Sequence, residues 1–186
     1  MDNAVVLYFD KDSENRLLNI MKNIINQGVN SYMTDVGIRP HITLAAWFNE
    51  KDREYTNEIE EFTLQVKGIK VLFSSIGVFP SAKSVVYLSP VKDDNLMGIH
   101  QKFYKHMEGK IDKYIDYYTP NHWVPHCTLA TKLSNSEVLT TISSILDKNF
   151  PLEAVISQVG LIKCNPVEEI LSCDIKLLRE IDGLNI

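Results

Sequence analysis

One short motif occurs twice in this chain of 186 residues. Pro40-His41-Ile42-Thr43-Leu44-Ala45 and Pro125-His126-Cys127-Thr128-Leu129-Ala130 agree at five of six positions and lie about half the chain apart. Histidine is scarce in the sequence, with only 5 residues, so a pair with matching flanks carries information. The repeat predicts two similar strands, one in each half of the chain.

The spacing within the motif determines where its side chains point. Residues i and i+2 of a strand share one face and lie about 6.5 to 7 Å apart. An imidazole and a hydroxyl therefore face the same way, while the residues between them pack on the opposite face. Two such strands, related by a pseudo-two-fold axis, would present two imidazoles and two hydroxyls to one ligand. That set of groups suits a tetrahedral phosphate.

The rest of the sequence predicts strands and helices in both halves, with no linker rich in Pro, Gly or Ser between them. Expected strands cover residues 4–9, 41–48, 62–66, 69–79, 84–88, 125–131, 152–163 and 169–178. Expected helices follow Asp12 as N-cap up to Gly28, span residues 51–61, follow Asp93 or Asp94, and run from a Ser134-x-x-Glu137 capping box to about Lys148. Residues 29–39 are expected to form a loop. We therefore expect one bilobal α+β domain over residues 1–186.

Composition limits the cellular context and the partners. With 45% hydrophobic residues, the chain can bury a real core, and it has no apolar run of membrane-spanning length and no signal peptide, so we expect a cytoplasmic protein without membrane contact. A formal net charge of -5 argues against binding to long duplex DNA. Three cysteines without CxxC spacing argue against disulfides and a cysteine zinc site. We expect a monomer that binds a small phosphorylated substrate, a nucleotide or a short RNA end.

Paired His-x-Thr motifs half a chain apart resemble those of the two-histidine (2H) phosphoesterases, which include RNA 2′,3′-cyclic phosphodiesterases and proteins named 2′-5′ RNA ligases. The similarity extends to the N-terminal strand and helix, to Gly77-Val78-Phe79-Pro80 before the strand Val85-Val86-Tyr87-Leu88, and to the helix from Leu96 to Met107. The resemblance implies an α+β fold with a bilobal, pseudo-two-fold arrangement of mainly antiparallel sheets, flanking helices and a central cleft.

The same resemblance implies catalytic roles for His41 and His126 and phosphate binding by Thr43 and Thr128. One neutral histidine would take a proton from water while the other, protonated, would donate one to the departing ribose oxygen. No metal or other cofactor is then needed. We expect a phosphoric diester hydrolase that acts on a 2′,3′-cyclic phosphate or a related cyclic phosphodiester. Two alternatives remain open, namely a 2′-5′ RNA ligase and a non-catalytic nucleotide- or RNA-binding module.

Further substrate contacts are predicted from residues near the motifs. Arg39 and Lys132 could offset phosphate charge, and aromatic residues could stack on a base. The aromatic candidates are Phe48, Trp123, Trp47 and Tyr32, and His122 is a weaker candidate for the cleft. Cys127 should point away from His126 by strand alternation, which argues against a nucleophilic role. His122, His126 and Cys127 lack the helical spacing and acidic neighbours of a metal site, so no metal ligands are predicted.

Overall fold

The computed structural model describes residues 1–49, 53–146 and 150–176, which form one antiparallel sheet of 7 strands and five α-helices. The strands are β1 (Asn3–Phe9), β2 (His41–Trp47), β3 (Ile69–Phe79), β4 (Ser84–Pro90), β5 (Cys127–Leu133), β6 (Leu152–Cys164) and β7 (Val167–Asp174). The helices are α1 (Lys11–Asn26), α2 (Tyr32–Asp35), α3 (Thr56–Thr63), α4 (Asp94–His106) and α5 (Asn135–Leu146), with a 3-10 turn η1 at Asp116–Tyr118.

The order of the strands in the sheet has a pseudo-two-fold symmetry, as expected for two related halves. It reads β2-β1-β6-β3-β4-β5, with β7 added beside β6. The centre is the pairing of residues 69–73 of β3 with residues 152–156 of β6. Moving outward from this centre, β1 corresponds to β4 and β2 corresponds to β5. The two strands that carry the repeated motif therefore stand at equivalent positions, one at each end.

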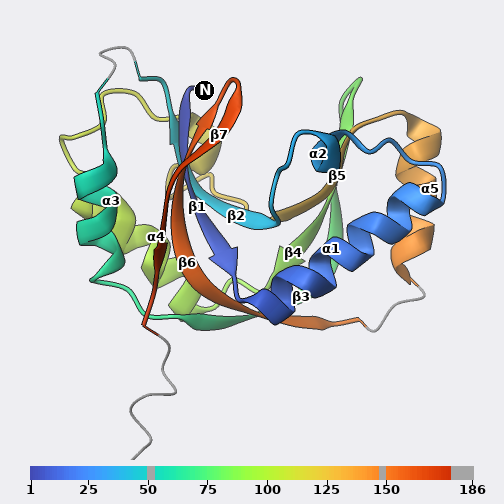
Figure 1. Ribbon diagram of the computed structural model, residues 1–186, viewed down its shortest axis with the longest axis horizontal. Coiled ribbons are helices and arrows are strands. Elements are labelled where there is room, and N and C mark those ends of the chain that lie inside the picture. The colour runs from blue at the N-terminus through green and yellow to red at the C-terminus, as the bar shows by residue number, and fades with distance from the viewer. Residues whose placement is uncertain (50–52, 147–149, 177–186) are drawn as a thin grey trace, which may run out of the picture.

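Helices cover the two halves of the curved sheet separately (Figure 1). Helices α1 and α5 contact each other and lie beside β4 and β5, whereas α3 contacts β6 and β7 and α4 contacts β3. The sheet curves enough for its two end strands, β2 and β5, to contact each other. The expected bilobal α+β fold is confirmed, with both halves sharing one continuous sheet. Among the described residues, none of the helices combines the length and apolarity needed to cross a bilayer.

Helix α1 begins slightly earlier than the sequence analysis expected. The N-cap is Asp10, whose carboxylate accepts a hydrogen bond of 2.9 Å from the Ser13 backbone N–H. Asp12, the residue expected to cap, lies inside the first turn, where its negative charge interacts favourably with the positive end of the helix dipole. The cap position follows from β1, because Asp10 is extended and directly follows the last strand residue.

The strand expected over residues 62–66 is wrong. Phe62 and Thr63 complete α3, and Phe62 is fully buried one turn after Ile59. The Thr63 hydroxyl donates to the Ile59 carbonyl at 2.8 Å, so this β-branched residue is accommodated in a helix. Burial of the Ile59 and Phe62 face outweighs local strand propensity. Two short elements, α2 and η1, were not predicted, and the expected helix start at residue 51 lies outside the described residues.

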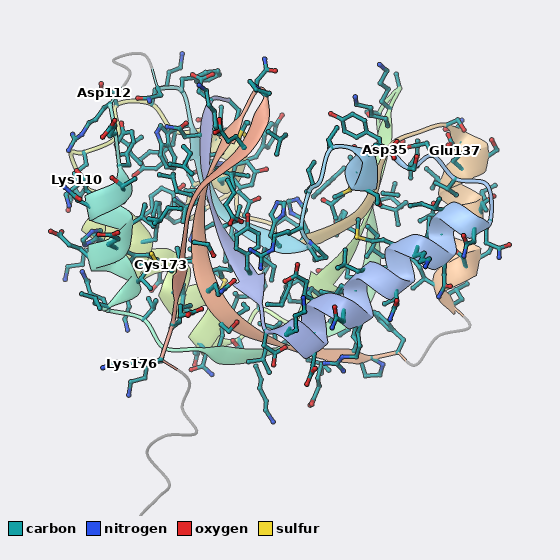
Figure 2. All side chains as sticks on the ribbon, in the orientation of Figure 1. Asp35, Lys110, Asp112, Glu137, Cys173 and Lys176 are labelled. Carbon is teal, nitrogen blue, oxygen red and sulfur yellow. The ribbon has the colours of Figure 1, made fainter. Side chains whose placement is uncertain are left out.

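The capping box at the start of α5 is confirmed. The Glu137 carboxylate accepts hydrogen bonds from the Ser134 backbone N–H at 2.9 Å and from the Ser134 hydroxyl at 2.7 Å. The same carboxylate accepts two bonds from Asn30, in the loop after α1, each 3.2 Å long. Glu137 thus joins the first turn of α5 to the chain segment that leads to the first motif. Figure 2 labels Glu137 beside α5. The predicted helix end near Lys148 falls outside the described residues.

Two glycines in the sheet lie under tyrosine rings at pseudo-equivalent positions. Gly160 on β6 faces the Tyr8 ring, and Gly77 on β3 faces the Tyr87 ring. A Cβ built on either glycine would overlap the tyrosine ring atoms above it. Neither glycine has a positive φ, so close approach of the ring, and not backbone conformation, explains the absence of a side chain.

We expect Gly160→Ala to lower the free energy of unfolding by about 1 to 3 kcal/mol, because the added methyl must displace the Tyr8 ring. Gly98→Ala is the matched control. Gly98 lies inside α4 with nothing within 4 Å of a built Cβ, so alanine there should raise the free energy of unfolding by about 0.5 to 1 kcal/mol. Urea denaturation of both variants measures the two effects. Equal stability of Gly160→Ala and the wild type would contradict the ring contact.

Candidate active site

The two motifs bring four polar side chains to one cavity. His41 and Thr43 come from β2, His126 directly precedes β5, and Thr128 lies on β5. All four line a cavity of about 410 Å³. A second cavity, of about 620 Å³, shares three of them and extends the site along an apolar wall. That wall includes Met33, Ile38, Phe79, Val85, Tyr117, Tyr118 and Val124.

Each motif histidine is tied to the backbone in the same way. Nδ1 of His41 donates to the Arg39 carbonyl, and Nδ1 of His126 donates to the Val124 carbonyl, both at 2.7 Å. A carbonyl oxygen only accepts, so Nδ1 carries the proton in both rings, and Nε2 is left for a ligand. A proline separates each histidine from its carbonyl partner and restricts the backbone on both sides. This restriction gives a physical reason for the proline in each copy of the motif.

Aromatic rings flank both imidazoles. Tyr8, paired with His41 across β1 and β2, has its ring centroid 6.2 Å from the His41 ring. His126 packs against a stacked pair of rings, with its centroid 4.9 Å from Phe79 and 5.3 Å from Tyr87, whose own centroids are 4.3 Å apart. Tyr8 and Tyr87 are the two rings that lie over glycines. The rings limit how far each imidazole can turn.

Burial lowers the pKa of both motif histidines below the ordinary value of 6.5. For His41, positive charge on His126 and on Arg39 lowers the pKa further, while the hydrogen bond to the Arg39 carbonyl acts in the opposite direction. Lowered pKa values favour the neutral form of both imidazoles at pH 7. A bound anion would favour protonation of one of them, because an opposite charge nearby stabilises imidazolium.

Trp123, predicted as a stacking residue, is buried and supports the site from behind. Its indole Nε1–H donates to the Thr43 carbonyl at 2.9 Å. Its ring stacks on the buried His100 imidazole, with centroids 3.9 Å apart and planes at 11°. Nε2 of His100 in turn donates to the Tyr118 carbonyl at 2.8 Å. The segment before the second motif is thereby fastened to the strand of the first.

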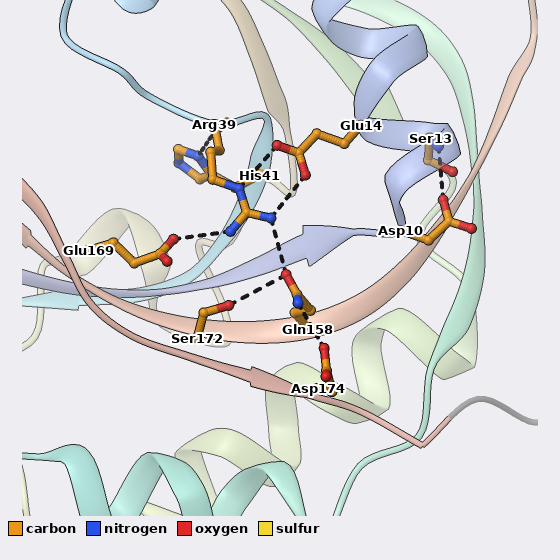
Figure 3. A network of polar contacts seen from close by, with 9 residues as sticks. All are labelled: Asp10, Ser13, Glu14, Arg39, His41, Gln158, Glu169, Ser172 and Asp174. Atoms are coloured by element: carbon orange, nitrogen blue, oxygen red, sulfur yellow. Dashed lines mark hydrogen bonds and ion pairs between the residues drawn. The ribbon is translucent and has the colours of Figure 1, made fainter.

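The side chains of three other residues predicted to contact substrate interact with protein groups instead. Arg39 lines the smaller cavity, but its guanidinium pairs with Glu14 and Glu169 (Figure 3). Lys132 lies on β5 with its ammonium nitrogen 3.4 Å from the Tyr32 ring centroid. Phe48 follows the far end of β2, roughly 23 Å along the strand from His41, and lies 5.2 Å from the Lys113 ammonium.

The remaining candidates divide between the core and the cavity wall. Trp47 is fully buried in the core. His122 lines the larger cavity. Cys127 is fully buried, and burial raises the pKa of its thiol to about 12, so the thiol has little thiolate character. Within residues 1–49, 53–146 and 150–176, no three His, Cys, Asp or Glu side chains are grouped as metal ligands.

Sequence reasoning missed several residues of the cavity wall. Tyr118, at the end of η1, lines both cavities, and burial raises the pKa of its phenol. Phe79 and Tyr8 also line the site. Phe79 lies in the segment Gly77-Val78-Phe79-Pro80 that carried part of the family resemblance, and this was a usable signal. Tyr118 lies in an irregular segment, where no periodicity assigns a face.

Comparison with known proteins gives relatives in sequence and in fold. A Bacillus licheniformis protein, whose name gives phosphoesterase as its provisional activity, is 25% identical over 128 residues, which cover 67% of this chain and 72% of the relative. The crystal structure of TT0787 from Thermus thermophilus superposes with a TM-score of 0.60 at 12% identity and covers 96% of this chain and 100% of its own. Escherichia coli LigT in complex with 3′-AMP gives 0.55 at 11% identity and covers 94% and 97%.

The model of one protein family, described as the 2′-5′ RNA ligase superfamily, matches residues 33–167. This span is well over half of the chain and includes both motifs and every strand from β2 to β6. The solved structures share the fold, and the relative at the sequence level shares the chemical class. The chain belongs to the 2′-5′ RNA ligase superfamily of two-histidine phosphoesterases.

Proposed function

We propose that this protein hydrolyses a 2′,3′-cyclic phosphate or a related cyclic phosphodiester, on an RNA end or a nucleotide, with His41 and His126 as the general acid and base. One observation carries the proposal. Two imidazoles, each tied to the backbone through Nδ1, border one cavity together with two threonine hydroxyls. Each ring can therefore exchange a proton only through Nε2.

The proposed reaction uses the two imidazoles in opposite protonation states. The neutral ring takes a proton from water as the water oxygen forms a bond to phosphorus. The bond from phosphorus to one ribose oxygen breaks, and the protonated ring gives its proton to that oxygen. A phosphate monoester leaves, and the two rings have exchanged protonation states. Thr43 and Thr128 donate hydrogen bonds to the non-bridging oxygens, where charge redistributes in the transition state.

The apolar cavity supports a nucleotide as the substrate. Its wall offers Phe79, Tyr117 and Tyr118 for contact with a base or ribose next to the histidines. A cavity of about 620 Å³ falls in the range of roughly 300 to 1,000 Å³ typical of small-molecule sites. LigT, which shares the fold, has been crystallised with 3′-AMP and with ATP. A small phosphorylated ligand is the partner that these observations favour.

The superfamily's name supports a second candidate, 2′-5′ RNA ligation or its reversal. In ligation a ribose 5′-hydroxyl takes the place of water: it gives its proton to the neutral ring and bonds to phosphorus, while the bond from phosphorus to the 3′ oxygen breaks and that oxygen takes the proton of the other ring. Cleavage of a 2′-5′ linkage is the same sequence of steps in reverse. A non-catalytic nucleotide- or RNA-binding module remains the third candidate. The next experiment separates the three.

Incubation with a nucleoside 2′,3′-cyclic phosphate, followed by product analysis, tests the proposed activity. We expect conversion to a single nucleoside monophosphate, because a ribose bound in one orientation would present only one of its two oxygens to the acid. A parallel incubation with an RNA 5′-hydroxyl acceptor and a 2′,3′-cyclic phosphate end tests ligation. Saturable binding without either product would support the binding module and end the hydrolase proposal.

Removal of either histidine should lower the rate by about 10²-fold or more, because each proton transfer contributes roughly 10² to 10⁴. We expect His41→Ala and His126→Ala to be similarly slow in single-turnover assays. The double variant should lose much less than the product of the two single effects, because the pair acts as a unit. Thermal melting checks that each variant is folded. A folded His41→Ala or His126→Ala protein with undiminished turnover would end the two-histidine mechanism.

The rate should depend on pH in a bell-shaped way, with a maximum of kcat/KM below pH 6.5. The profile of kcat/KM reports the free enzyme, in which burial lowers both imidazole pKa values below 6.5. Above that pH both rings are neutral and the acid is lost. Bound phosphate raises the imidazole pKa, so the profile of kcat should lie at higher pH than that of kcat/KM. Steady-state rates between pH 4 and 9 measure both profiles, and a kcat/KM maximum above pH 7 would contradict the neutral pair.

A further inference from the structure

The Arg39 side chain forms hydrogen bonds to three other side chains, so its guanidinium is already occupied (Figure 3). Its guanidinium forms a two-point pair with Glu14, through Nε at 3.0 Å and Nη2 at 2.9 Å. Nη1 donates to Glu169 at 3.1 Å, and Nη2 also donates to Gln158 at 3.1 Å. The guanidinium carbon lies 4.0 Å from the Tyr8 ring centroid. Four elements, α1, β1, β6 and β7, thus fix one side chain.

The partners of this cluster are themselves fixed. Gln158 donates through Nε2 to Asp174 at 2.8 Å, and its Oε1 accepts a bond from the Ser172 hydroxyl. Glu14 is only 13% exposed. Two carboxylates surround one guanidinium, so a phosphate that approached Arg39 would also meet two negative charges. The cluster is therefore a poor anion site.

The backbone carbonyl of Arg39 contacts the ring of His41. The Arg39 carbonyl accepts the 2.7 Å bond from Nδ1 of His41, and only Pro40 lies between the two residues. Because proline restricts the residue before it to extended backbone, fixing Arg39 also fixes its carbonyl. The contacts that fix the Arg39 guanidinium therefore also help to fix the orientation of the His41 ring.

The second half has no matching cluster in the described residues. The carbonyl that holds His126 belongs to Val124, whose side chain is apolar and 39% exposed. The His126 ring packs instead against the stacked rings of Phe79 and Tyr87. The two histidines have equal backbone bonds but unequal supports.

We propose that Arg39 is a positioning residue that holds His41 in its Nδ1–H tautomer, with Nε2 toward the cavity, and does not bind substrate phosphate. The catalytic consequence rests on the proposed function, whereas the tautomer does not. The decisive variants are Arg39→Gln and Glu14→Gln, because Glu14 lies outside the cavity that contains the histidines. Glu58→Gln is the matched control, since Glu58, on α3, pairs with Arg53 at 2.6 Å and is similarly buried, at 16% exposed.

The first measurement is the ¹⁵N spectrum of the histidine side chains, recorded above their pKa values. In the wild type and in Glu58→Gln, His41 should be the Nδ1–H tautomer. In Arg39→Gln and Glu14→Gln, His41 should become a mixture of tautomers, while His126 stays unchanged. A pure Nδ1–H tautomer at His41 in folded Arg39→Gln overturns the proposal, whatever the activity of the protein.

The second measurement is turnover of a nucleoside 2′,3′-cyclic phosphate. If the His41 ring is no longer held in one orientation, kcat should fall by about 10- to 100-fold in both Arg39→Gln and Glu14→Gln, with KM within about twofold of the wild type. Arg39→Lys should not restore kcat, because lysine cannot form the two-point pair with Glu14. A raised KM with normal kcat in Arg39→Gln, together with a normal Glu14→Gln, would identify Arg39 as a phosphate ligand. If the wild type itself shows no turnover, the proposed function fails and the spectra alone decide the tautomer.

Discussion

The pairing of β3 with β6 is the constraint on which the rest of the molecule depends. Residues 69–73 and 152–156 form the only ladder between the two halves of the described sheet. Each of these long strands continues past the junction into its own half, where β6 pairs with β1 and β3 pairs with β4. The motif strands are the next ones outward on each side, and the sheet curves so that they contact each other and bring His41 and His126 to one cavity. The bond from Trp123 to the Thr43 carbonyl adds a direct link between the two halves.

The second constraint is the bond between each imidazole and a carbonyl two residues earlier. A short backbone bond fixes the tautomer more firmly than a flexible side-chain partner would, and it adds no charge to the site. Burial lowers the pKa of both rings and so favours their neutral forms at pH 7. A bound anion would favour protonation of a neighbouring imidazole, so ligand binding and protonation at this cavity are linked.

The sequence predicted much of this arrangement and missed specific parts of it. The repeat located the motif strands, since strand alternation makes two polar side chains share a face whatever the tertiary structure. The capping box at Ser134, and a cap of α4 at Asp93 or Asp94, were predicted because they depend on local hydrogen bonds, and the structure has Asp93 as the cap. Phe62 was assigned to a strand because its helical burial depends on long-range packing. The partners of Arg39 lie 25, 119 and 130 residues away along the chain, and no local pattern in one sequence indicates such pairs.

The pseudo-two-fold order of the strands affects how the surroundings of the two histidines can change in evolution. A homodimer of two identical half-chains could build the same two-imidazole cavity, but every substitution beside one ring would appear beside the other. In a single covalent chain the two halves mutate independently. The ion cluster beside His41 and the stacked aromatic pair beside His126 are two different environments at equivalent positions of one sheet. A single chain thus permits each of the two histidines to have surroundings of its own.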